Sequence, residues 1–231
     1  MKIRLFLGLP LAMAMTLSTH AAVTDNFDGY LLGSDLHGQG NWTGWDSNPT
    51  AGGIVSDAYA YSGTQSVNIS GGSDRVDTFS GIFGGSWSFS IMQYIPTIST
   101  GTSFVILMNQ YNDGALGAKS WSSQVEYDMA LGEVRSGGNT LTMVKGAWVE
   151  SRFWINLATN TVHEYYNGEL IRTGPWQDGN GLDELQAVDL YANNADPVYY
   201  DNLSVTQVPE PATLTILALG GLGVLRRRRM K

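Results

Sequence analysis

Short runs in which apolar residues recur at every second position dominate the middle of this 231-residue chain. The runs lie at 86–95, 124–129, 148–157, 161–166 and 198–205. Alternate side chains of a strand point to opposite faces, so this period is typical of strands with one face in a core. Turn residues separate the runs, and the Asn167-Gly168 pair is a strong hairpin signal. Only 182–187 could form a turn or two of helix, so the pattern predicts an all-β sandwich or barrel.

The C-terminal segment differs from the rest of the chain. Two prolines, Pro209 and Pro211, flank one glutamate, and they cannot continue a strand or helix, so we expect the folded domain to end before them. An uncharged, mostly apolar run follows at 212–225, shorter than the roughly 20 residues that span a bilayer with ease. Four arginines at 226–229 come directly after it. Because such clusters stay on the cytoplasmic side, the segment is predicted to be a short transmembrane helix that leaves the domain outside.

This order of Val-Pro-Glu-Pro, short apolar helix and arginine cluster resembles the PEP-CTERM sorting signal of Gram-negative bacteria, which the membrane protease exosortase handles. The resemblance implies transient anchoring in the inner membrane with the C-terminus in the cytoplasm, and cleavage near 209–211. It also implies a final place at the cell surface, in the extracellular matrix or in secreted form, often alongside exopolysaccharide production. The sorting and cleavage residues that it identifies are Pro209, Glu210, Pro211, Arg226, Arg227, Arg228 and Arg229.

The N-terminus has the layout of a secretory signal peptide. Lys2 and Arg4 precede an apolar run at 5–17, and small residues, including Ala21 and Ala22, provide a cleavage site for signal peptidase. We therefore expect three segments: a signal peptide at 1–22, a β-sandwich domain at 23–207 and the sorting tail at 208–231.

Without its two ends, the chain is strongly acidic. Six Lys and Arg residues then face 20 Asp and Glu residues, which gives the domain a formal charge of −14, and all seven tryptophans and eleven tyrosines remain. Such a surface repels nucleic acid, so nucleic-acid partners are excluded, and it suits divalent cations or neutral sugars. The chain has no cysteine, so disulfides and Cys-type zinc sites are excluded.

Several segments resemble concanavalin A-like, or laminin G-like, jelly rolls. These are 25–30, 60–69, the strand pair ending in 166–170, and the closing strand at 199–205. The resemblance implies a two-sheet antiparallel jelly-roll sandwich. It fixes the architecture and leaves the activity open.

Aromatic residues are the candidates for carbohydrate binding. Alternation in 148–157 places four side chains on the face opposite to Val149, Phe153 and Ile155; they are Trp148, Glu150, Arg152 and Trp154. Indoles stack on the C–H faces of sugars, while the charged groups bind hydroxyls; the alternative is that these tryptophans complete a second small core under a loop. Four more candidates lie in Gly- and Asn-rich loops, namely Trp42, Trp45, Trp121 and Trp176.

Paired carboxylates raise the question of catalysis. Glu126 and Asp128 lie on one strand face and resemble the first half of the Glu-x-Asp-x-x-Glu signature of jelly-roll glucanases. The third acid is missing, because position 131 is Leu131. A solvated strand face explains the pair equally well. A lyase would need a base such as His163 or Tyr165 beside an arginine.

Calcium is the metal that the sequence could accommodate, since hard oxygen ligands abound. First and last strands of jelly rolls are commonly neighbours, which would bring Asp25 or Asp28 near Asp201 and create a structural Ca²⁺ site. The alternative is that these aspartates cap turns.

Three functional hypotheses follow. The favoured one is a non-catalytic surface or matrix protein whose sandwich binds carbohydrate or exopolysaccharide, because no complete catalytic constellation is present. The second is a secreted glycoside hydrolase or polysaccharide lyase that uses carboxylates on the concave sheet. The third is a structural envelope protein without a specific ligand.

Overall fold

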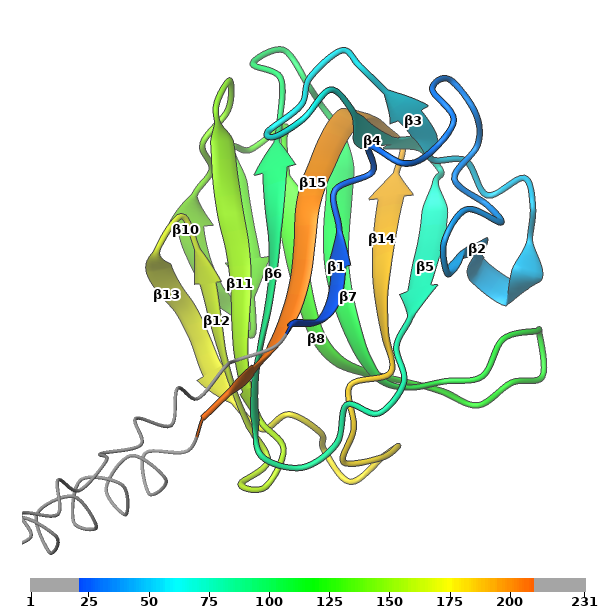
Figure 1. Ribbon diagram of the computed structural model, residues 1–231. Coiled ribbons are helices and arrows are strands. Elements are labelled where there is room, and N and C mark those ends of the chain that lie inside the picture. Colours follow the sequence, from blue (N-terminus) through cyan, green and yellow to red (C-terminus); the bar gives the residue numbers. More distant parts are fainter. Residues whose placement is uncertain (1–20, 210–231) are drawn as a thin grey trace, which may run out of the picture.

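The computed structural model describes residues 21–209, which form two antiparallel β-sheets packed face to face (Figure 1). One sheet has eight strands and the other has seven, and the helical content of this part of the chain is one short 3₁₀ turn, η1 (Trp45–Ser47). The predicted all-β sandwich is confirmed.

The eight-stranded sheet has the strand order β13-β12-β11-β6-β15-β4-β3, and β1 pairs with β15. Its strands are β1 (Ala21–Asp25), β3 (Ile54–Ser56), β4 (Ser66–Gly71), β6 (Ser86–Tyr94), β11 (Trp148–Asn156), β12 (Thr161–Tyr166), β13 (Glu169–Gly174) and β15 (Ala195–Val208). The seven-stranded sheet has the order β10-β9-β8-β7-β14-β5-β2. Its strands are β2 (Trp42–Gly44), β5 (Asp74–Thr78), β7 (Thr102–Tyr111), β8 (Lys119–Asp128), β9 (Glu133–Ser136), β10 (Asn139–Thr142) and β14 (Ala187–Asn193).

The alternating runs form strands as predicted. The run 161–166 coincides with β12, and Asn167 and Gly168 join it to β13 with φ angles of 50° and 80°, the left-handed pair that a two-residue hairpin turn requires. The segment 182–187 is not helical. Its backbone N–H groups are used elsewhere: Leu185 donates to the carbonyl of Ile82, and Gln186 donates to that of Met108.

The core lies between the sheets. In β11 the side chains of Val149, Phe153 and Ile155 are buried, as the alternation predicts. A buried polar network crosses the same space. The Glu164 carboxylate accepts hydrogen bonds from Ser123 and Ser136 of the other sheet and forms an ion pair with Arg172, so these charges are buried with partners.

The first and last strands of the described part are neighbours, as the jelly-roll resemblance implies: Asp25 of β1 lies opposite Leu203 of β15, and Figure 1 shows the two strands side by side. In residues 21–209 no helix is long and apolar enough to cross a membrane. The predicted signal peptide and transmembrane helix lie almost entirely outside the described residues, so the three-segment division remains a prediction.

Candidate functional site

A row of side chains crosses the outer face of the seven-stranded sheet from strand to strand. Asp74 of β5 lies opposite Tyr191 of β14, which lies opposite Phe104 of β7. Phe104 in turn lies opposite Glu126 of β8, and Glu126 opposite Arg135 of β9. Since paired residues of neighbouring strands project to the same side, these five side chains form a continuous track across the sheet.

A cavity of about 270 Å³ lies over this track. We call it the aromatic groove, and it is lined by Trp45, Asp74, Phe104, Ile106, Trp121, Gln124, Asp189 and Tyr191. Beneath it is a second, smaller hydrophobic cluster, separate from the main core, that includes Val76, Ile106 and Met108. Part of this outer face is therefore covered by aromatic rings and is not plain solvated sheet.

Two stacked ring pairs border the aromatic groove. Trp45 and Trp121 stack with ring centroids 5.6 Å apart and an interplanar angle of 18°. Phe104 and Tyr191 stack at 5.5 Å and 24°. Trp121 is 51% exposed, so a large indole face is open to a ligand. Of the loop tryptophans that the sequence singles out, the structure brings Trp45 and Trp121 together here.

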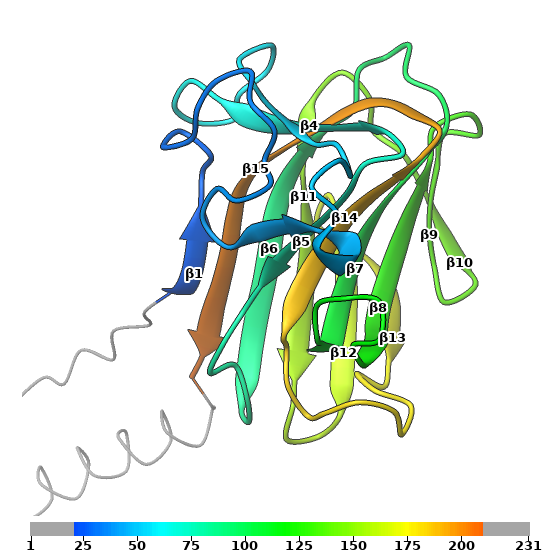
Figure 2. The ribbon, with the colours of Figure 1, turned by 90° about the vertical axis from the view of Figure 1, so that its right-hand side faces the viewer.

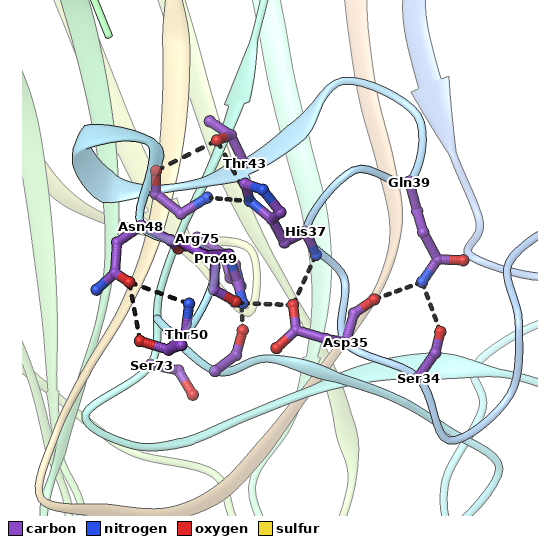
Figure 3. Close-up of polar contacts among 12 residues, drawn as sticks. Ser34, Asp35, His37, Gln39, Thr43, Asn48, Pro49, Thr50, Ser73 and Arg75 are labelled. Atoms are coloured by element: carbon purple, nitrogen blue, oxygen red, sulfur yellow. Dashed lines mark hydrogen bonds and ion pairs between the residues drawn. The ribbon is translucent and has the colours of Figure 1, made fainter. Parts of the chain in front are cut away.

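The loop that carries Trp45 is held by a buried arginine (Figure 3). Arg75 lies in β5 and is fully buried; its guanidinium forms an ion pair with Asp35 and donates to the backbone carbonyls of Gly52 and Pro49. His37 accepts a hydrogen bond of 3.1 Å from the N–H of Gly44, the residue before Trp45. These contacts fix the loop against the sheet edge before any ligand arrives.

The chain direction at η1 depends on tight backbone geometry. A Cβ atom on Gly44 would lie 1.8 Å from the carbonyl oxygen of Asn48, so only glycine fits there. Asp46 and Ser47 both have positive φ angles, 56° and 59°, which non-glycine residues adopt rarely. β2 is the edge strand of the seven-stranded sheet, and Figure 2 shows the 3₁₀ turn that follows it at this edge of the sandwich. The Trp45 ring packs against Tyr111 of β7 and Trp121 of β8, so the turn places Trp45 over the seven-stranded sheet.

Side chains at the ends of β7 and β8 hold the other side of η1. Lys119 pairs with Asp46 at 2.6 Å, and its Nζ atom lies 5.3 Å from the centroid of the Trp45 ring. The Tyr111 hydroxyl accepts from the N–H of Asp46 and donates to Asp113. Burial and the bond to Asp113 raise the pKa of Tyr111, so it stays a neutral donor.

Two carboxyl groups meet at the bottom of the aromatic groove. Asp189 is 3% exposed, and Asp74 is half-buried on the adjacent strand. One oxygen of each is buried without a hydrogen-bond partner in the described residues. Burial raises the pKa of Asp74, and burial together with the Asp74 charge raises the pKa of Asp189 well above its usual range. The two side chains interact directly, and burial favours the neutral form of each.

A second cavity of about 340 Å³ adjoins the first, with Gln124 lining both. It lies beside Glu126 and the loop that follows Arg135. Arg135 forms ion pairs with Glu126 at 3.2 Å and Asp128 at 3.1 Å. Glu126 and Asp128 thus share a face, as predicted, and both are bound by one guanidinium. This geometry favours the solvated-face interpretation over catalysis by the pair.

Trp148, Glu150, Arg152 and Trp154 lie on the outer face of the eight-stranded sheet, away from the aromatic groove. Trp148 contacts the rings of Tyr61 and Tyr94, and Trp154 packs on His163 with ring centroids 5.0 Å apart. Glu150 and Arg152 form an ion pair with each other. Carbohydrate binding by this face remains a prediction.

Trp42 and Trp176 are not accessible to a ligand, so the prediction of exposed binding indoles is wrong for them. Trp42 is 2% exposed and donates its Nε1–H to Asp25, while Trp176 is 1% exposed and donates to the carbonyl of Glu184. Each buried ring finds an acceptor for its N–H inside the domain.

The predicted calcium ligands are engaged by hydrogen-bond donors. The Asp25 carboxylate accepts from Tyr30, Trp42 and the N–H of Phe27. Asp28 and Asp201 accept backbone N–H groups of the loop at 61–65. Residues 21–209 contain no group of three or more His, Asp or Glu side chains arranged to hold a metal. The geometry favours turn capping, and a calcium site here remains a prediction without structural support.

The sequence pattern did not single out Asp74, Asp189, Phe104 or Tyr191. One signal was available: Asp189 interrupts the apolar segment Ala-Val-Asp-Leu-Tyr, and a carboxylate inside an otherwise buried strand is costly unless it has a partner or a function. The partner strands could not be read from the sequence, so neither could the meeting of Asp189 with Asp74.

Comparison with known proteins supports the sorting motif at the C-terminus and the fold of the domain. The model of the PEP-CTERM protein-sorting motif matches residues 207–229. The chain carries a PEP-CTERM sorting motif. The motif implies processing by exosortase, export and sorting to the cell surface. A search of the curated proteins found no match.

Solved structures confirm the concanavalin A-like sandwich. An endo-β-1,4-glucuronan lyase from the fungus Trichoderma reesei is similar with a TM-score of 0.53 and 14% identity, over 82% of this chain and 96% of that chain. The T. cruzi calreticulin globular domain is similar with a TM-score of 0.55 and 10% identity, over 90% and 95%. A sialidase is similar with a TM-score of 0.51 and 9% identity, over 81% of this chain and 19% of that chain. At such low identity the likeness shows the fold alone.

Proposed function

We propose that this protein is an exported, exosortase-sorted surface or matrix protein that binds polysaccharide across the outer face of its seven-stranded sheet, without cleaving it. The observation that carries the proposal is the continuous track of rings and polar groups from Asp74 to Arg135, with adjoining cavities of about 270 and 340 Å³. An extended glycan needs an open site of this kind, where rings stack on sugar faces and amides and charges meet hydroxyls.

The sorting tail suggests where the protein acts. In this proposal signal peptidase removes 1–22, the apolar run at 212–225 anchors the chain in the inner membrane with its C-terminus in the cytoplasm, and exosortase cleaves near Pro209–Pro211. The domain then reaches the cell surface, the extracellular matrix or the medium. Glycans that carry no negative charge suit the domain's formal charge of −14.

Glycan cleavage is the second candidate function, and Asp189 is the observation that favours it. Carboxyl groups with raised pKa values in a groove are found at catalytic sites more often than elsewhere. Asp74 and Asp189 are in direct contact, however, whereas the two carboxyls of retaining glycosidases stand about 5 Å apart. Binding is therefore the better supported function.

Affinity electrophoresis tests the proposal. The full chain, kept in a detergent without a sugar headgroup, is run through gels that each contain one bacterial or plant polysaccharide. We expect at least one glycan to slow the protein, and we expect Trp121→Ala to remove most of the retardation, because Trp121 provides the exposed indole face of the groove.

Two controls make the result specific. Trp148→Ala and Trp154→Ala remove indoles from the opposite sheet and should leave retardation unchanged. If these two variants abolish retardation and Trp121→Ala does not, the binding face is the outer face of the eight-stranded sheet. Release of reducing ends or unsaturated sugars during incubation would contradict a non-catalytic function. No retardation by any glycan in the panel would contradict polysaccharide binding.

A further inference from the structure

In the described part of the chain, the carboxyl pair in the aromatic groove forms no ion pair with a Lys or Arg side chain. Residues 21–209 contain six Lys and Arg residues. Arg75, Lys119, Arg135, Arg152 and Arg172 form ion pairs with other carboxylates. Lys145, the sixth, donates to the backbone carbonyls of Ser99 and Met129. Asp74 and Asp189 thus form no ion pair within residues 21–209; the positive charge that acts on Asp74 is that of Arg75, whose guanidinium is paired with Asp35.

The surroundings of this pair favour a positive group over a neutral one. Asp189 is 3% exposed with a buried oxygen that lacks a partner, and it lines the cavity directly. The ring pairs Trp45–Trp121 and Phe104–Tyr191 line the same cavity. Aromatic faces attract cations within about 6 Å of the ring centroid. A recess with carboxyls at the bottom and rings at its edge matches an ammonium group.

The chain itself shows that these rings accept an ammonium. The Nζ atom of Lys119 lies 5.3 Å from the centroid of Trp45 and 5.5 Å from that of Tyr111, next to Asp46. At the other end of the track, Glu126, Asp128 and Glu133 share the single guanidinium of Arg135. The face as a whole is therefore negative and attracts cationic chains.

We propose that the aromatic groove recognises glycans with free amino groups, and that Asp74 and Asp189 bind the ammonium group while Trp45 and Trp121 contact the sugar ring. This rests on the proposed function and names its ligand class. The sugar that carries the amine is not changed.

The test compares two probes of equal length: a hexamer of β-1,4-linked glucosamine and the same hexamer with every amine acetylated. Binding to the full chain is measured by calorimetry near pH 6. We expect the amine form to bind at least about tenfold more tightly, because hydrogen bonds to charged groups are the stronger ones. Asp74→Asn should abolish this preference, so that the two hexamers bind with similar affinity. Asp189→Asn, which resembles the protonated residue, serves as a second variant and should reduce the preference.

Glu150→Gln is the matched control, since it also removes one negative charge but lies on the opposite sheet. Equal effects of Asp74→Asn and Glu150→Gln would show unspecific attraction to an acidic surface and overturn the inference. Equal affinity for the two hexamers would overturn it as well and would leave the proposed polysaccharide binding standing. If neither hexamer nor any other glycan of the gel panel binds, the proposed function itself fails.

Discussion

Replacing Asp77 by asparagine should stabilise the protein at alkaline pH. Asp77 lies in β5, faces the interior of the sandwich and is 3% exposed, and one of its oxygens is buried without a hydrogen-bond partner in the described residues. Burial, with a smaller contribution from the nearby Asp25 charge, raises the pKa of Asp77 from 3.8 to about 7. The folded state therefore prefers the neutral acid.

The sign and the size of the change in folding stability follow from the raised pKa of Asp77. A folded-state pKa above the unfolded one adds stability that is complete below pH 3.8 and is lost as the pH rises through about 7. The difference is about three pKa units, and each unit corresponds to about 1.36 kcal/mol, so ionisation of Asp77 costs the folded state about 4 kcal/mol at pH 8. Asparagine keeps the shape and cannot ionise.

Thermal unfolding at pH 5 and pH 8 measures the effect. We expect Asp77→Asn to raise the melting temperature at pH 8 by about 8–16 °C relative to the natural chain, and to have a much smaller effect at pH 5, since 1 kcal/mol shifts a domain of this size by about 2–4 °C. The exposed Asp57→Asn serves as the control. The Asp74–Asp189 pair is present in both proteins, so a difference between their pH dependences can come only from Asp77. If the melting temperatures of Asp77→Asn and of the natural chain change with pH in parallel, the reasoning is refuted.

Three further predictions concern stability. Glu164→Gln leaves Arg172 without its counter-ion between the sheets and should lower the free energy of unfolding by about 3 kcal/mol, measured by denaturant titration. Gly44→Ala puts a Cβ atom 1.8 Å from the carbonyl oxygen of Asn48 and should cost about 2 kcal/mol or more and weaken glycan binding through Trp45; Gly72→Ala, with no atom within 4 Å, is the matched control. Calcium and chelator should leave the melting temperature equal if the aspartates of the calcium hypothesis cap turns; a higher midpoint with calcium would establish a site.

The strands and their inward faces were predictable because they depend on local alternation. The runs that became β6, β11 and β12 were predicted within a residue of their ends, and β11 turned Phe153 and Ile155 inward as expected. The hairpin at Asn167-Gly168 was predictable for the same reason, since two residues determine the turn.

The site was less predictable because it depends on strand order. Trp45 and Trp121 are 76 positions apart in the chain, and no local pattern states that they stack. Asp74 meets Asp189 only because β5 pairs with β14. Trp42 and Trp176 are in loops by sequence, yet each ring is buried because its Nε1–H finds an acceptor inside the domain, Asp25 for Trp42 and the carbonyl of Glu184 for Trp176.

The last strand before the sorting tail and the aromatic groove lie in different sheets, which matters for how the protein would present its groove at a surface. β15 ends at Val208 in the eight-stranded sheet, where Val208 lies opposite Ser86; the sorting motif begins at residue 207. The groove opens on the outer face of the seven-stranded sheet. If the chain is held through its C-terminus, the attachment follows the last strand of the eight-stranded sheet. The rings and carboxyls of the groove lie on the other sheet. We therefore expect glycan binding to be the same before and after the tail is cleaved. The affinities of the tailed and the tail-less protein for one polysaccharide measure this. A difference between them would show that the tail contacts the groove and would contradict the prediction.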